Sequence, residues 1–169
     1  MAADLSAADE LAGRLVAMLI AGGETLAVVE SCTGGEVGAA LTRVPGASGC
    51  LWGSVVAYTA AAKRQLIGVS ADVLDAHGIV SMVTTRDLAR RARDLAQTTY
   101  GAAVTGWAGP GTDGPDPVGT VYLAVSGPDR LRALRCVYDG DRVAVRRAAT
   151  SGLLGCLIEE VTHDRDTAS

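Results

Sequence analysis

The sequence predicts an α/β fold built on a layered, mixed sheet of five strands. Short apolar runs with strand character alternate along the chain with amphipathic segments of helical periodicity, which is the pattern of a layered α/β protein. Residues 127–129 join two of these strands and are too few for a crossover connection, so that pair must be antiparallel. The length of 169 residues is typical of one domain.

The first half of the chain supplies two strands and four helices. Leu11, Leu15 and Leu19 recur with helical spacing, and the glycine pair after them ends that helix. Glycine, proline or capping residues separate the elements that follow. In chain order we expect a helix over about 5–22, a strand over 25–29, a helix from about 37 that ends before Pro45, a strand over 51–59, and short helices over 60–67 and 70–77.

The second half begins with a longer helix, which Thr84 or Thr85 can cap and which runs to about Thr99. Within it Leu88, Ala92 and Leu95 face inward, and Arg90 pairs with Asp94 on the outer face. Apolar or alternating runs then predict strands over 102–107, 119–126 and 131–137, followed by a last helix over about 141–161 and a disordered tail, 162–169.

Composition and charge exclude several classes of protein. Hydrophobic residues make up 49% of the chain and charged residues 20%, which excludes a disordered or coiled-coil protein. The net charge of −4 argues against nucleic-acid binding, and no apolar run is long enough to cross a membrane. The four cysteines lie far apart from one another and from the two histidines, so no metal site is expected. We therefore expect a cytoplasmic protein with reduced thiols and no signal peptide.

A polar turn follows the first strand. Ser31-Cys32-Thr33-Gly34-Gly35 leads into a helix, and backbone N–H groups at such a position can bind a phosphate or a developing oxyanion. The Ser31 hydroxyl would stand exposed at this turn. The alternative is structural, with Ser31 or Thr33 simply capping the helix.

A tyrosine and the only lysine of the chain follow the second strand. The chain contains a single lysine, Lys63, among 15 basic residues, and an amine can lose its proton near neutral pH whereas a guanidinium cannot. A desolvated Lys63 can take the proton of a serine hydroxyl while Tyr58 relays or orients it. The alternative is a half-buried strand tyrosine and a solvated surface lysine.

The third strand leads into a loop rich in glycine and proline. Four glycines and three prolines between Gly109 and Gly119 indicate a shaped loop at the rim of a pocket. The loop lacks the Gly-Lys-Ser/Thr of a Walker A motif, and Ser31 lacks the Gly-x-Ser-x-Gly of an α/β-hydrolase. Spacing alone leaves a serine amidase or esterase and a phosphate-binding pocket both open.

Eight motifs occur along the chain in the following order: Val29-Glu30-Ser31-Cys32-Thr33-Gly34-Gly35, Val44-Pro45-Gly46-Ala47-Ser48, Val55-Val56-Ala57-Tyr58-Thr59 with Lys63, Leu66-Ile67-Gly68-Val69, His77-Gly78-Ile79-Val80-Ser81, Val104-Thr105-Gly106-Trp107-Ala108-Gly109-Pro110, Pro117-Val118-Gly119-Thr120-Val121 and Gly140-Asp141-Arg142. In kind and order they resemble the motifs of one known family, the C-terminal domain of the CinA (competence/damage-inducible) proteins, whose stand-alone form is nicotinamide-nucleotide amidase. The resemblance covers roughly residues 8–162 of the single domain expected for 1–169.

The resemblance implies a three-layer α/β/α fold and hydrolysis of nicotinamide mononucleotide (NMN) to nicotinate mononucleotide and ammonia, in pyridine-nucleotide salvage. It implies no metal or cofactor, no nucleic-acid or membrane partner, and a homo-oligomer, with a dimer as the expected form.

The resemblance also implies roles for individual residues. Ser31 is the expected nucleophile and Lys63 its general base, with Tyr58 supporting them. The remaining residues are expected to bind substrate. The N–H groups around Cys32, Thr33 and Gly34 are the expected oxyanion hole, with Gly35 beside them. Thr105, Gly106 and Gly109 are expected to line the pocket, Arg142 to contact the substrate phosphate or another subunit, and Ser48 to offer a second hydroxyl near the site.

This chain departs from the family pattern beside its lysine. Ala60 and Ala61 stand where the family usually has Asn-Glu, and Trp107 stands where it often has a smaller aliphatic residue. If the missing Asn orients the lysine or the amide, its loss costs about 1.5–3 kcal/mol of transition-state binding. The rival hypothesis is therefore a nucleotide-binding or regulatory module of the same fold without turnover. An amidase for another amide is a third interpretation.

Overall fold

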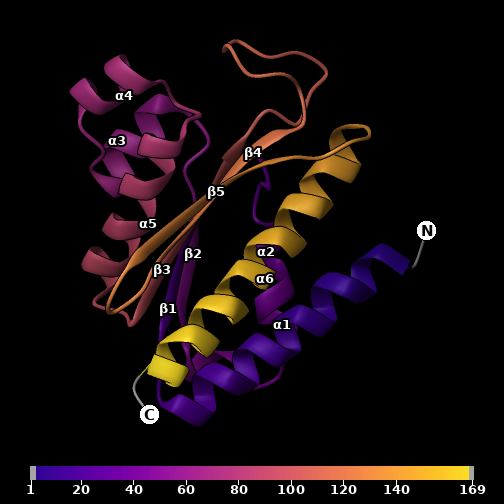
Figure 1. The fold of residues 1–169 in the computed structure, drawn as a ribbon, viewed down its shortest axis with the longest axis vertical. Helices are drawn as coiled ribbons and strands as arrows, with labels where there is room; N and C mark the ends of the chain where they lie inside the picture. The colour runs from indigo at the N-terminus through magenta and orange to yellow at the C-terminus, as the bar shows by residue number, and fades with distance from the viewer. Residues whose placement is uncertain (1–2, 168–169) are drawn as a thin grey trace.

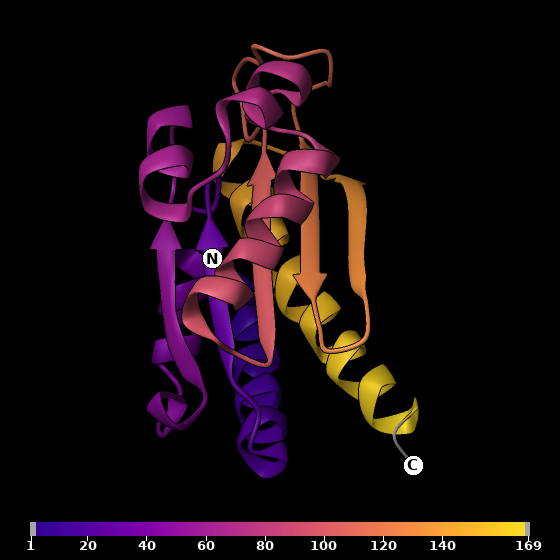
Figure 2. The ribbon, with the colours of Figure 1, turned by 90° about the vertical axis from the view of Figure 1, so that its left-hand side faces the viewer.

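A single mixed sheet of five strands forms the centre of the computed structural model, which describes residues 3–167. The strand order is β2-β1-β3-β4-β5. β1 pairs in parallel with β2 and with β3, whereas β4 is antiparallel to both of its neighbours, which confirms the predicted mixed sheet (Figure 2). The strands are β1 Leu26–Glu30, β2 Leu51–Val56, β3 Tyr100–Gly106, β4 Thr120–Ser126 and β5 Leu131–Val137.

Helices cover both faces of this sheet, so the expected three-layer α/β/α fold is confirmed (Figure 1). On one face lie α1 Ala3–Gly22, α2 Glu36–Thr42 and α6 Arg142–Thr167, and on the other lie α3 Ala60–Ile67, α4 Ala71–His77 and α5 Met82–Ala96. A short 3-10 turn, η1 Ala47–Gly49, precedes β2. Within residues 3–167 no helix combines the length and the apolar character needed to cross a bilayer.

Alternation along the buried strands divides the core into two clusters, one under each helical layer. Val28 of β1 packs with Leu15 of α1 and Leu153 of α6, and its neighbour Val29 packs with Leu88 of α5 on the opposite face. Successive side chains of a strand point to opposite faces, so a central strand buried on both sides is apolar throughout. This accounts for the continuous apolar run before Glu30.

The close approach of α5 to β3 depends on a glycine. A Cβ atom at Gly101 would lie 2.2 Å from the carbonyl oxygen of Ala89 and 2.5 Å from the backbone nitrogen of Arg93. Both neighbours are backbone atoms of α5, which cannot rotate away. Gly101 therefore sets how closely this helix layer packs on the sheet.

Two details of the predicted α5 are wrong. The helix begins at Met82 and Ser81 is its N-cap, because the Ser81 hydroxyl accepts the Thr84 N–H at 3.1 Å. Thr84 and Thr85 are instead buried within the first turns of the helix, and Leu95 is 61% exposed. Ala92 and Ala96, in the same last turns of the helix, make the contact with the core instead. The expected Arg90–Asp94 ion pair is present, at 3.5 Å.

The predicted disordered tail is also wrong for residues 162–167, since α6 continues to Thr167. The last turns are held by tertiary contacts: Arg165 donates to the carbonyl oxygen of Met18 and to the Glu24 carboxylate, each at 2.6 Å. Asp164 is buried beside them. Residues 168–169 of the expected tail lie outside the described residues.

Candidate active site

A pocket of about 390 Å³ opens where β1, β2 and β3 end, which is the usual place for a ligand in a sheet with parallel strands. Its walls come from five places in the chain: the turn after β1, the loop after β2 with the start of α3, the segment before α5, the loop after β3, and the start of α6. The lining residues are Ser31, Cys32, Tyr58, Thr59, Ala60, Ile79, Val80, Gly106, Trp107, Ala108, Gly109, Gly111, Asp113 and Arg142.

Ser31 lines this pocket, and the fully buried Lys63 contacts Ser31 from behind the lining. The Nζ atom of Lys63 lies 3.1 Å from the Oγ atom of Ser31 and donates to the carbonyl oxygen of Ala57 at 2.8 Å. Lys63 lies on helix α3, which begins directly after Thr59. The Thr59 hydroxyl caps the N-terminus of this helix by accepting the Ala62 N–H. The lysine therefore lies one turn into a helix that starts at the end of β2.

The Lys63 side chain is fully buried, so the interpretation as a solvated surface charge is wrong. Burial disfavours the charged ammonium and lowers the pKa of Lys63 from 10.5 to about 8. At a pKa of about 8 a useful fraction of the amine is neutral near neutral pH. A neutral amine has a lone pair that can accept a proton from Ser31.

Glu30, which we did not predict as a site residue, holds the whole turn that carries Ser31. Its carboxylate is fully buried and accepts five hydrogen bonds of 2.6–3.1 Å. The donors are the hydroxyls of Thr33 and Ser54 and the N–H groups of Gly35, Val37 and Gly38. The sequence did contain a signal for Glu30: this glutamate directly precedes the candidate nucleophile, at the start of a turn with many N–H groups.

The hydrogen bonds of this turn also show which residue caps α2 and which N–H groups are already bonded. Capping by Ser31 or Thr33 is wrong, because Gly35 is the N-cap of α2 and the Thr33 hydroxyl donates to Glu30 at 2.7 Å. Gly34 N–H donates to the carbonyl oxygen of Ser31. Within residues 3–167 this leaves the N–H groups of Cys32 and Thr33 without an acceptor.

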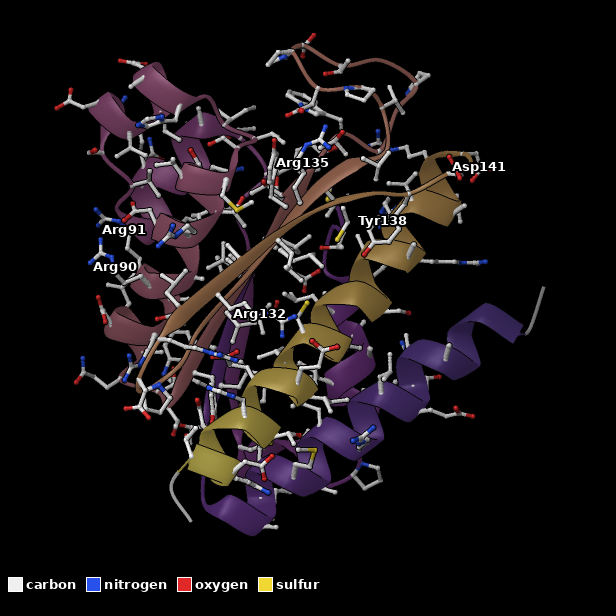
Figure 3. The ribbon with its side chains drawn as sticks, in the orientation of Figure 1. Arg90, Arg91, Arg132, Arg135, Tyr138 and Asp141 are labelled. Atoms are coloured by element: carbon white, nitrogen blue, oxygen red, sulfur yellow. The ribbon has the colours of Figure 1, made fainter. Side chains whose placement is uncertain are left out.

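Tyr58 and Arg142 bridge the mouth of the pocket. The guanidinium of Arg142 donates to the Tyr58 hydroxyl at 2.7 Å and to the carbonyl oxygen of Gly109. In the described part of the chain the Tyr58 hydroxyl makes no hydrogen bond to Ser31 or Lys63, and its side chain is half exposed. Arg142 is placed by Asp141, whose carboxylate caps the start of α6 (Figure 3).

The loop after β3 is anchored at its far end. Asp116 accepts hydrogen bonds from the Tyr122 hydroxyl at 2.7 Å and from Arg135 at 2.9 Å. Tyr122 lies on β4 and Arg135, which is labelled in Figure 3, lies on β5. These bonds lower the pKa of Asp116. The anchor keeps the intervening residues, including Asp113, at the rim of the pocket, as predicted for this loop.

Six predicted site residues do not line the pocket, namely Lys63, Thr33, Gly34, Gly35, Ser48 and Thr105. Ser48 is exposed on η1, before β2 begins, whereas the pocket lies where β2 ends. Thr105 is fully buried behind the pocket wall, and its hydroxyl lies 2.8 Å from that of Thr85 on α5. Cys32 does line the pocket, and burial raises the pKa of its thiol to about 12.

Fold and pocket together define a three-layer α/β protein with a buried serine–lysine contact at the carboxyl ends of its parallel strands. Residues 8–161 match the family model of the CinA C-terminal domain, and the chain therefore belongs to this family.

Relatives support the same membership. A CinA-like protein of Anaeromyxobacter sp. (strain K) is 49% identical over 150 residues, which make up 88% of this chain and 37% of that protein. A CinA-like protein of Myxococcus xanthus is 48% identical over 137 residues, 80% of this chain and 32% of that protein. The chain thus spans about a third of the length of these curated relatives.

Solved structures share the fold. A competence-damaged protein (CinA) superfamily protein from Klebsiella pneumoniae aligns with a TM-score of 0.89 and 32% identity, covering 92% of this chain and 98% of that one. A competence/damage inducible protein from Agrobacterium tumefaciens aligns with a TM-score of 0.87 and 33% identity, covering 90% and 94%.

Proposed function

We propose that the chain hydrolyses the amide of nicotinamide mononucleotide to nicotinate mononucleotide and ammonia, with Ser31 as nucleophile and Lys63 as general base. The contact between the Lys63 Nζ atom and the Ser31 Oγ atom carries this proposal. A buried amine of lowered pKa beside a hydroxyl in a pocket is the arrangement that activates a serine without histidine.

The reaction proceeds in two halves. As the Ser31 Oγ atom bonds to the amide carbon, its proton passes to the neutral Lys63 amine. The tetrahedral intermediate collapses, and the departing nitrogen takes that proton and leaves as ammonia. Water then attacks the acyl-serine ester, again losing a proton to Lys63, and that proton restores the Ser31 hydroxyl as the product leaves as a carboxylic acid, which ionises in water.

The N–H group of Cys32, which lines the pocket, is the best candidate for binding the oxyanion of this intermediate, with the N–H group of the fully buried Thr33 next to it in the chain. They belong to the turn of Ser31 and have no acceptor within the described residues, whereas Gly34 and Gly35 already donate to Ser31 and Glu30. Donors that need no rearrangement lower the barrier most, and one such donor contributes about 2.7–4 kcal/mol in a well-studied serine protease.

Arg142 is the candidate for the phosphate of the substrate. Its planar guanidinium matches two phosphate oxygens, and it lines the pocket together with the half-exposed Tyr58, to which it donates a hydrogen bond. A nucleotide with its amide at Ser31 and its phosphate at Arg142 contacts the pocket lining at two places. The volume of about 390 Å³ falls within the usual range for ligand sites.

A binding module without turnover is the second candidate function. It is favoured by Ala60, which lines the pocket at the start of α3 and offers no polar side chain to the amide. Ammonia and nicotinate mononucleotide released from NMN by the wild type and by Ser31→Ala decide between the two. Turnover that disappears in the variant supports the amidase. A folded wild type that binds NMN without releasing ammonia supports the binding module.

A further inference from the structure

Trp107 forms the part of the pocket wall that directly follows β3. Its N–H donates to the carbonyl oxygen of Thr120 at 2.9 Å, and its carbonyl oxygen accepts the Gly119 N–H at 2.7 Å. Both bonds continue the β3–β4 pairing beyond Gly106. The backbone of Trp107 is thus held by the sheet, and its side chain starts from a fixed point beside Ser31 in the same pocket.

The indole of Trp107 is held by close packing against the loop. A Cβ atom at Gly114 would lie 3.0 Å from Cζ2 and 3.3 Å from Nε1 of the indole, closer than side chains normally approach. The Nε1 atom is buried and has no hydrogen-bond acceptor within residues 3–167. Because the indole N–H donates no hydrogen bond there, the packing serves to hold the flat apolar ring of Trp107 in position.

The other apolar lining residues are small or aliphatic, namely Ala60, Ile79, Val80 and Ala108. The only other aromatic side chain of the wall, Tyr58, is half exposed and its hydroxyl accepts a hydrogen bond from Arg142. Trp107 is therefore the largest flat surface of the pocket that no polar contact occupies.

We propose that Trp107 is a specificity-determining residue, whose indole stacks on the flat ring of an aromatic carboxamide and selects it over aliphatic amides. This inference rests on the proposed amide hydrolysis and adds the part of the substrate that the wall recognises. An aromatic side chain can stack on any nucleobase, because stacking requires only a flat π-face. A pyridine ring offers the same kind of face.

Two substitutions at this position separate the ring from the indole N–H. Trp107→Phe and Trp107→Leu both remove the N–H, but only Phe keeps an aromatic face. We expect the KM for NMN to rise about tenfold or more in Trp107→Leu and to stay within about threefold of wild type in Trp107→Phe, with kcat changed little in both. Equal KM values in the two variants, with circular dichroism showing both folded, would overturn the proposal.

Fluorescence gives a second readout that does not depend on turnover. The chain has two tryptophans, and Trp52 on the edge strand β2 is 61% exposed and outside the pocket, so Trp52→Phe leaves Trp107 as the only tryptophan reporter. In Trp52→Phe combined with Ser31→Ala, titration with NMN should quench the Trp107 emission saturably. An aliphatic primary amide, propionamide, should leave the emission unchanged.

The two readouts separate failure of the inference from failure of the proposed function. Turnover of NMN with no change in Trp107 emission would overturn the stacking role and keep the amidase. Quenching by NMN without turnover in the Trp52→Phe protein would keep the stacking role and overturn the amidase. Neither quenching nor turnover would overturn both.

Discussion

The Nζ atom of Lys63 lies 3.1 Å from the Oγ atom of Ser31, although the two residues are 32 positions apart in the chain. Ser31 follows β1, and Lys63 lies on the helix that follows β2. Because β1 and β2 are parallel neighbours, both ends fall at the same edge of the sheet. The parallel pairing therefore creates the contact, and the substitutions below test what it does.

Lys63→Arg should reduce amide turnover by about 10²–10⁴-fold while the protein stays folded. The guanidinium keeps a positive charge but does not lose its proton near neutral pH, so it cannot accept the proton of Ser31. Ammonia release measured beside the circular dichroism spectrum checks this. An active Arg variant would exclude Lys63 as the general base.

Activity should follow the titration of Lys63. With the pKa of Lys63 lowered to about 8, the fraction of neutral amine increases about tenfold for each unit that the pH rises toward that value, and kcat/KM should rise with it and level off above pH 8. Initial rates with NMN between pH 6.5 and 9.5 measure the profile. A rate independent of pH across this range would contradict the general-base role.

Protein stability should depend on the same titration. Between pH 8 and 10.5 the unfolded chain keeps a proton on Lys63 that the folded protein has lost, so the free energy of unfolding rises with pH there. Relative to Lys63→Met, the wild type should gain roughly 3 kcal/mol as pH increases from 7 to 10.5. Urea unfolding of both proteins at several pH values measures this difference. A constant difference would show that Lys63 is not desolvated.

Glu30→Gln should destabilise the protein by about 2–3 kcal/mol, because an amide offers one acceptor where the buried carboxylate has two. Since the turn of Ser31 depends on these bonds, turnover should fall as well. Glu10→Gln, on an exposed part of α1, is the control and should stay within about 0.5 kcal/mol of wild type. Urea unfolding compares the two, and equal stability would remove Glu30 as the support of the turn.

Gly101→Ala should cost about 1–3 kcal/mol or more, because the added Cβ would meet backbone atoms of α5. Gly13→Ala is the matched control. Gly13 lies inside α1 with nothing within 4 Å of the added atom, so alanine should stabilise by about 0.5–1 kcal/mol. Thermal unfolding of both variants checks the contrast, and similar melting temperatures would refute it.

Most of the fold could be predicted from local patterns. Hydrophobic periodicity and the flanking turn residues predicted α3 and β5 at their observed bounds. The short connection 127–129 predicted the antiparallel pairing of β4 and β5. The errors lie where a long-range contact overrides a local pattern. The last turns of α6 are polar and were expected to be disordered, but Arg165 holds them to Glu24, far away in the chain.

The candidate site was predictable only in its residue types. Ser31, Tyr58 and Lys63 could be named from motifs, yet the sequence does not say that Lys63 is fully buried or that the Tyr58 hydroxyl is bonded to Arg142. Glu30 was missed because its five donors come from a turn, a helix and a neighbouring strand, which converge only when β1 and β2 pair.

The order of strands and helices along the chain, and the edge of the sheet where the polar loops gather, follow from local patterns, since periodicity and turn residues act over a few positions. Which of those polar groups touch, and how far each is removed from water, follows from the packing of the folded chain. Burial and hydrogen bonding depend on packing between elements distant in the chain. They set the pKa of Lys63, and with it the chemistry available to Ser31.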